Sequence, residues 1–161
     1  MRKILSFFVL LGFVGSATFS LAEQQDGPFK KYYPSGKVFM EGSYNNGKPE
    51  GVVKAYSESG SLQTELNYKD GKLSGVSKSY FENGVLSTEN SYVGGIREGV
   101  QRAYLEDGTL VGEFNLKNGQ VDGIARGYHK NGQVAEEATF KSGQLIHLKK
   151  YDQTGKLISE K

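Results

Sequence analysis

Few residues in this sequence have the types and spacing that catalysis requires. The chain has no cysteine, and its two histidines are His129 and His147. They occupy unrelated places in the chain and no shared partner is visible, so surface histidines are favoured over a catalytic or metal-binding pair. No nucleophile–base set is present, and no glycine-rich phosphate loop precedes a helix. The residues argue against an enzyme and predict neither a cofactor nor a metal site.

Glutamate is the first residue type that recurs at a fixed interval. The recurring residues are Glu41, Glu65, Glu89, Glu113 and Glu137, followed by Glu160. Such a row could bind cations, or it could pair with lysines and arginines nearby. Calcium sites usually concentrate several oxygens in one loop, and the sequence has no such Asp-rich loop. Structural pairing or solvation is therefore the favoured interpretation.

Tyrosine is the second residue type that recurs at a fixed interval, and the row of these tyrosines is the candidate binding face. Its members are Tyr32, Tyr56, Tyr80, Tyr104, Tyr128 and Tyr151. A line of rings with polar tips can stack on sugars, pack against a partner's side chains or lie at a membrane surface. The alternative, favoured for any single tyrosine, is that the rings form the hydrophobic layer of the sheet itself.

Both rows follow from an internal repeat. Gly27, Gly51, Gly75, Gly99 and Gly123 are separated by 24 residues each time. They open units 27–50, 51–74, 75–98, 99–122 and 123–145, and a partial unit, 146–161, follows one residue early. Counted from that glycine, position 4 is basic, position 6 is tyrosine, positions 10 and 21 are glycine, and position 15 is glutamate. Fixed spacing of this kind indicates a repeat architecture.

Two glycines per unit, each ending a polar cluster, predict two strands and two turns. For the first turn, a two-residue type I′ form would place Ser35, Ser59 and Thr154 at positive φ, which these residues resist. We favour a three-residue loop, with Pro34 in a type I turn and Gly36 in the left-handed conformation.

The favoured loop also predicts which residues share a face. It puts positions 2, 6, 12 and 18 on one apolar, aromatic face, and the glutamate and basic rows on opposite faces. A two-residue turn would instead set positions 4 and 15 directly opposite each other. Since a single unit cannot bury enough surface to fold, the units must stack. The expected fold is all-β, an elongated antiparallel sheet of about six β-hairpins.

The first residues resemble an export signal. Arg2 and Lys3 precede the apolar run 4–14, and Ser20-Leu21-Ala22 fits the small-x-small rule for cleavage after Ala22. We therefore expect a helical signal peptide at 1–22, a linker at 23–26, and a periplasmic or secreted protein. An uncleaved anchor is the alternative, although the run is shorter than the roughly 20 residues of a membrane-spanning helix.

Removing the leader leaves 18 basic and 18 acidic residues, a net charge of zero. Nonspecific nucleic-acid binding depends on clustered positive charge, so no nucleic-acid partner is expected. Without the leader, no transmembrane segment is expected either.

The pattern G-x-x-K-x-Y-x-x-x-G-x-L-x-x-E-x-x-Y-x-x-G resembles the bacterial variant of the MORN repeat, over residues 27 to about 160. This chain departs from the pattern at Leu116 and Phe140, which replace the second tyrosine of the unit, and at the Gly94-Gly95 turn. The resemblance implies an elongated hairpin sheet with an interaction or scaffold role. Some relatives carry antitoxin-family annotation, which fits poorly with an export signal, and phospholipid binding is associated with eukaryotic members.

These observations together predict an exported, non-enzymatic repeat protein whose partner is an unidentified protein. Binding of cell-envelope glycan or lipid through the aromatic row is the first alternative. An antitoxin or immunity-type role is the second.

Overall fold

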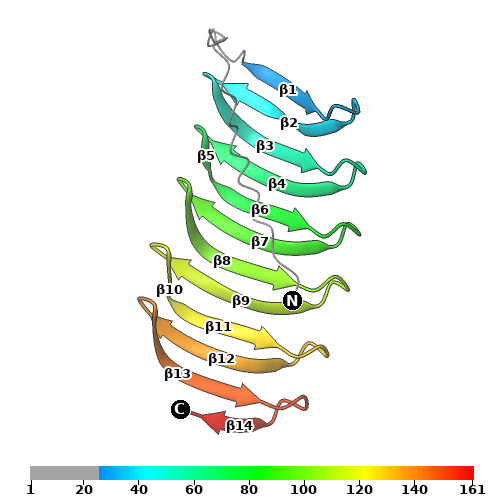
Figure 1. The fold of residues 1–161 in the computed structure, drawn as a ribbon. Coiled ribbons are helices and arrows are strands. Elements are labelled where there is room, and N and C mark those ends of the chain that lie inside the picture. The colour runs from blue at the N-terminus through cyan, green and yellow to red at the C-terminus, as the bar shows by residue number, and fades with distance from the viewer. Residues whose placement is uncertain (1–25) are drawn as a thin grey trace, which may run out of the picture.

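The computed structural model describes residues 26–161, which form one 14-stranded antiparallel sheet in a single layer (Figure 1). Within this part of the chain there is no helix, and so none that could span a membrane. The all-β fold of stacked hairpins with a 24-residue repeat is therefore confirmed. The expected signal peptide, 1–22, lies outside the described residues.

The strands follow one another across the sheet in chain order. They are β1 (Gly27–Tyr32), β2 (Val38–Asn45), β3 (Lys48–Tyr56), β4 (Leu62–Lys69), β5 (Lys72–Leu73), β6 (Gly75–Tyr80), β7 (Leu86–Val93), β8 (Ile96–Tyr104), β9 (Leu110–Lys117), β10 (Gln120–Val121), β11 (Gly123–Tyr128), β12 (Val134–Lys141), β13 (Gln144–Tyr151) and β14 (Leu157–Glu160). The short β5 and β10 pair with β4 and β9. β5 with β6, and β10 with β11, each correspond to one uninterrupted strand in the other units, namely β3, β8 and β13.

The first turn of each unit has the predicted three-residue form. In the first unit, Gly36 N–H donates to the Tyr33 carbonyl at 2.9 Å, and Tyr33 N–H donates to the Lys37 carbonyl at 2.8 Å. Gly36 has φ of 82°, as a type I turn followed by a left-handed residue requires. The same pair of bonds closes the turns at Gly60, Gly84, Gly108, Gly132 and Gly155.

The second turn has two residues, both at positive φ, as in a type I′ turn. In the first unit they are Asn46 and Gly47, with φ of 51° and 68°. Gly94 and Gly95 keep this form in the third unit, where Val93 pairs directly with Ile96. Both series of turns lie along the two long edges of the sheet (Figure 1).

The predicted assignment of faces was wrong for two positions, because every hairpin contains a β-bulge. Tyr32 pairs with Val38, but Lys31 pairs with Met40, so Phe39 at position 13 is an extra residue. The bulge shifts the register by one, so that Lys30 lies directly opposite Glu41 and the two side chains share a face. Basic, tyrosine and glutamate residues thus lie together, on what we call the glutamate face.

The same shift moves position 18 to the other face. Tyr44 pairs with Gly27 and packs on Phe29, with ring centroids 4.5 Å apart. The most buried side chains also lie on this side: Val53, Ser77 and Gln101 at position 3, and Leu116 at position 18. The small core of this single-layer sheet therefore lies behind the glutamate face.

Glycine in the first turn makes a testable contribution to stability. A Cβ at Gly84 meets nothing within 4 Å, and the residue has φ of 81°. Gly84→Ala should therefore cost about 1–2 kcal/mol of unfolding free energy through backbone strain alone, and Gly84→Asn should cost less. Gly127→Ala, at ordinary φ with its nearest contact at 3.9 Å, is the control and should show no loss in chemical denaturation. Equal losses at both positions would contradict this account.

Candidate functional site

On the glutamate face, tyrosine hydroxyls link neighbouring units. Each bond runs from the tyrosine of one unit to the glutamate of the preceding unit. The donor–acceptor pairs are Tyr56 to Glu41 at 2.7 Å, Tyr80 to Glu65 at 2.8 Å, Tyr104 to Glu89 at 3.2 Å, and Tyr128 to Glu113 at 3.0 Å. The two rows that the sequence singled out therefore form one ladder of hydrogen bonds.

The basic row completes this ladder within each unit. Its nitrogen–oxygen distances are 2.9 Å for Lys30–Glu41, 3.4 Å for Lys54–Glu65, 3.7 Å for Lys78–Glu89, 3.2 Å for Arg102–Glu113, 2.9 Å for Arg126–Glu137 and 3.7 Å for Lys149–Glu160. The repeated glutamates thus pair with lysine and arginine side chains, as the favoured interpretation of the sequence expected. With their carboxylates engaged in this way, these glutamates are poorly suited to binding a metal ion.

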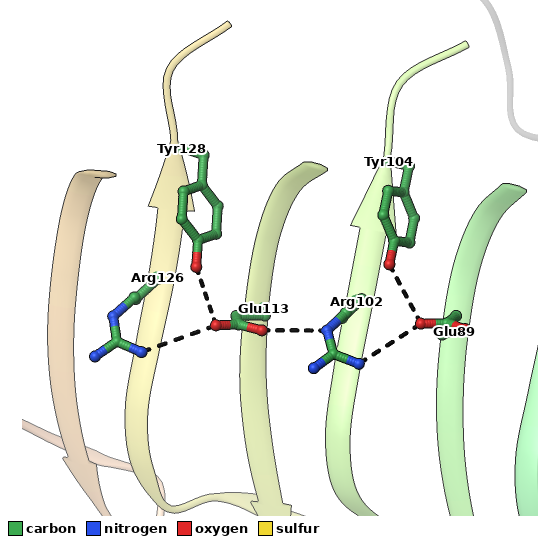
Figure 2. Close-up of polar contacts among 6 residues, drawn as sticks. All are labelled: Glu89, Arg102, Tyr104, Glu113, Arg126 and Tyr128. Carbon is green, nitrogen blue, oxygen red and sulfur yellow. Dashed lines mark hydrogen bonds and ion pairs between the residues drawn. The ribbon is translucent and has the colours of Figure 1, made fainter. Parts of the chain in front are cut away.

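Arginine extends the ladder between units. Arg102 lies 3.2 Å from Glu113 and 3.6 Å from Glu89, and Arg126 lies 3.8 Å from Glu113 (Figure 2). A guanidinium carries five donors in a fork and can contact two carboxylates at once. The third to fifth units are therefore joined into one continuous polar chain, as Figure 2 shows.

These contacts shift the pKa values of both partners. The hydrogen bond from Tyr56, followed by that from Lys30, lowers the pKa of Glu41. The bond to Glu41, followed by burial, raises the pKa of Tyr56 to about 12. Burial, followed by the bond to Glu65, raises the pKa of Tyr80 to about 12. At neutral pH the bond therefore joins a protonated phenol to an ionised carboxylate.

The two ends of the tyrosine row differ from its middle. Among the described residues, neither the Tyr32 nor the Tyr151 hydroxyl has a glutamate partner, and Tyr32 is 59% exposed. The four inner rings are half-buried, with their hydroxyls bonded. The candidate row thus contains four residues that connect units and two with free hydroxyls.

A second inter-unit contact, which sequence reasoning missed, lies along the edge of two-residue turns. A carboxylate at the end of one unit accepts a backbone N–H from the next turn. The pairs are Asp26 with Gly47 at 2.9 Å, Glu50 with Asp70 at 2.8 Å, Glu98 with Asn118 at 2.7 Å, and Asp122 with Ser142 at 2.9 Å. The sequence feature that could have predicted this contact is the acidic residue at position 24 of the unit. Ser74 replaces the acid at this position in the second unit, which precedes the Gly94 turn.

The histidines lie in separate places. His129 directly precedes the three-residue loop 130–132, and its Nε2 lies 2.9 Å from the Tyr151 carbonyl oxygen. His147 is in β13, and its Nε2 lies 2.8 Å from Glu160 Oε1, in an orientation that makes no hydrogen bond. The structure does not bring the two histidines together.

An exposed aliphatic row runs beside the ladder on the glutamate face. It consists of Val52, Val76, Val100 and Ile124 at position 2, which are 46%, 42%, 39% and 44% exposed. A groove of about 640 Å³ lies between Pro28 and Val52, and one of about 570 Å³ lies between Val52 and Val76. This row, which we call the aliphatic row, presents apolar surface once per unit.

The five complete units match a known repeat. The family model described as "MORN repeat variant" matches residues 25–46, 49–70, 73–93, 97–118 and 121–142. The chain belongs to the MORN repeat variant family. The last MORN-like hairpin, β13–β14, lies beyond the matched residues but continues the sheet. A comparison with curated proteins finds no match, so the antitoxin association implied by the resemblance has no support from a relative.

The inter-unit bond can be tested by removing one hydroxyl. Tyr80→Phe deletes the donor to Glu65 while keeping the ring. The loss should cost about 1–2 kcal/mol, between the values for neutral hydrogen bonds and for bonds to charged groups, because both side chains are part-exposed. Tyr32→Phe is the matched control, since its hydroxyl has no glutamate partner among the described residues, and should be neutral in denaturant unfolding. Equal effects would show that the bond adds no stability.

The same bond predicts how stability depends on pH. The pKa of Tyr80 is raised from 10.0 to about 12, so its contribution is complete below pH 10 and is lost as the pH rises through about 12. The pKa of Glu65 is lowered from 4.5, so its contribution is complete above that pH and is lost as the pH falls through the folded pKa.

Unfolding free energies measured from pH 3 to 12 should therefore differ most between wild type and Tyr80→Phe near neutrality, and converge at both extremes. A difference that stays constant with pH would contradict the assignment.

Proposed function

We propose that this MORN-repeat chain is an exported, non-enzymatic scaffold that binds another protein through its glutamate face. The observation that carries the proposal is the aliphatic row, Val52, Val76, Val100 and Ile124, exposed on one face at a fixed interval. Interface cores are depleted in charge and enriched in apolar and aromatic groups. A row of this kind, with tyrosine rings on the same face, meets that description.

The charges of this face favour a protein partner as well. Each repeated glutamate from Glu41 to Glu137 already has a cation within 3.7 Å, supplied by its own unit. A partner that covers the face would therefore bury ion pairs rather than unpaired charges, which avoids the largest desolvation penalties. The grooves beside Val52 are wide and open, and suit side chains better than a small ligand.

The tyrosine row has a supporting part in this proposal. The bonds of Tyr56, Tyr80, Tyr104 and Tyr128 hold the units in register, so the aliphatic residues keep their spacing. The Tyr32 and Tyr151 hydroxyls, which have no glutamate partner among residues 26–161, are available to bond to a partner. The six tyrosines and the aliphatic row together form the proposed binding face.

Export rests on the leader, residues 1–22. Its charged start, apolar run and Ser20-Leu21-Ala22 end are typical of a cleaved signal. The first described strand, β1, begins at Gly27, so cleavage after Ala22 would remove no strand. The mature chain would begin at Glu23.

Binding of envelope glycan or lipid is the alternative that the same face permits. Ring faces can stack on sugars, but most of the hydroxyls that would bond to them are occupied inside the sheet. The lysines and arginines of the basic row on this face are paired with glutamates, so they do not form the uncompensated positive cluster that an anionic lipid surface would favour. An antitoxin or immunity role would come only from relatives, and none supports it.

The binding test compares four forms of residues 23–161 as bait for an envelope extract. Wild type and Val93→Asp, a control at a residue 63% exposed outside the aliphatic row, should retain the same partner protein. The double variant Val76→Asp/Val100→Asp should retain at least 10-fold less of this partner. Val76→Thr/Val100→Thr is a second, milder variant of the same two residues. Circular dichroism confirms that each variant is folded.

Parallel sedimentation with washed peptidoglycan and with anionic vesicles separates the alternatives. Retention only by glycan or vesicles, or retention by the Asp variant equal to wild type, would overturn the protein-binding proposal. The full chain should be recovered from the periplasm or the medium with Glu23 at its N-terminus. Recovery from the cytoplasm with the leader intact would contradict export.

A further inference from the structure

Some neighbouring units are joined through very few backbone pairings. Between β4 and β6 these are Thr64 with Ser79 and Glu65 with Lys78. Between β9 and β11 they are Gly112 with Gly127 and Glu113 with Arg126. Positions 14 and 15 of one unit thus meet positions 5 and 4 of the next, and the tyrosine–glutamate bond is added beside them.

The last described strand, β14, carries the same two residues. Ser159 and Glu160 pair with Lys150 and Lys149 of β13, just as Thr64 and Glu65 pair with Ala55 and Lys54. Within residues 26–161, the other side of β14 has no strand against it. Among the described residues, positions 14 and 15 at this edge therefore have no strand paired to their outer side.

The first strand, β1, is complementary to this edge. It carries Lys31 at position 5 and Lys30 at position 4, and its outer side has no strand against it in the described residues. Among the described residues, the Tyr32 hydroxyl has no glutamate partner, and Glu160, whose side chain is 46% exposed, accepts no bond from a tyrosine. One edge is basic and offers a donor, while the other offers a carboxylate.

We propose that two copies of this chain associate head to tail, with β1 of one pairing with β14 of the other. Lys30 then lies opposite Glu160, Lys31 lies opposite Ser159, and the Tyr32 hydroxyl donates to Glu160. The contact continues the interface already present between units inside the chain, and it covers the exposed Tyr32 and Ile158. Of the proposed protein-binding face it uses Tyr32 alone and leaves the aliphatic row open, so failure of this contact would leave the proposed function standing.

The symmetry of this contact determines the type of assembly. The two edges are different surfaces, so a dimer leaves one of each free and further copies can add in a line. Because few residues take part, the association should be weak and depend on concentration. Short linear oligomers are the expected form.

Cross-linking tests the geometry, since the natural chain has no cysteine. Lys31→Cys and Ser159→Cys are made separately in residues 23–161 with tags of different mass, then mixed and oxidised. Directly opposite residues have Cβ atoms roughly 4.5–5.5 Å apart, close enough to form a disulfide after small adjustment. The mixed dimer should exceed both homodimers several-fold; random pairing, or cross-linking no faster than with Ser159→Cys alone, would overturn the proposal.

Charge reversal tests the partners in the uncross-linked protein. Sedimentation velocity should show concentration-dependent oligomers for wild type and monomers for Lys30→Glu or Glu160→Lys alone. Mixing these two variants restores opposite charges at the joint and should restore oligomers, whereas a mixture that stays monomeric would refute the pairing.

Tyr32→Phe should weaken association roughly 3- to 10-fold, the range for one hydrogen bond. Val93→Asp is the control and should leave association unchanged. Circular dichroism establishes that each variant is folded. Association of Tyr32→Phe equal to wild type would remove the proposed hydroxyl bond.

Discussion

Each inner tyrosine hydroxyl of the array reaches back across one unit to a glutamate carboxylate, 2.7 to 3.2 Å away. A single-layer sheet has no second layer to hold its strands in place, and Val53 and Leu116 are the only apolar side chains among the described residues that are almost fully buried. Contacts between neighbouring units must therefore supply much of the order. The tyrosine–glutamate bond does so on the glutamate face, and the carboxylate contacts at the two-residue turns do so along one edge.

The polar ladder and the apolar surface of the glutamate face have complementary roles. The ladder neutralises the charge of every inner glutamate, so the face that remains is defined by its aliphatic residues. If lysine or arginine were absent from position 4, the same face would carry a line of free carboxylates. Internal pairing is thus what makes a face with one glutamate per unit suitable for apolar contact.

Much of the fold could be predicted from glycine spacing alone. Side chains with a Cβ are strained in the left-handed conformation of Gly36 and its equivalents, so the period and the three-residue loop were visible in the sequence. The bulge was not, because position 13 is occupied by Phe39, Gln63, Ser87, Val111 and Ala135, which share no chemistry. Without the bulge, the sequence pattern predicts the glutamates on the wrong face. The tyrosine–glutamate bonds between units could therefore not be predicted, although the tyrosine and glutamate rows themselves are visible in the sequence.

The strands run across the long axis of the sheet (Figure 1), and this has a mechanical consequence. A pull on the two ends of the array loads the backbone hydrogen bonds along their own direction, one strand pair after another. Bonds loaded in succession yield at lower force than bonds sheared together. Each released unit adds up to about 80 Å of extended chain, so the array lengthens in steps and acts as a compliant spring between whatever is attached to its ends.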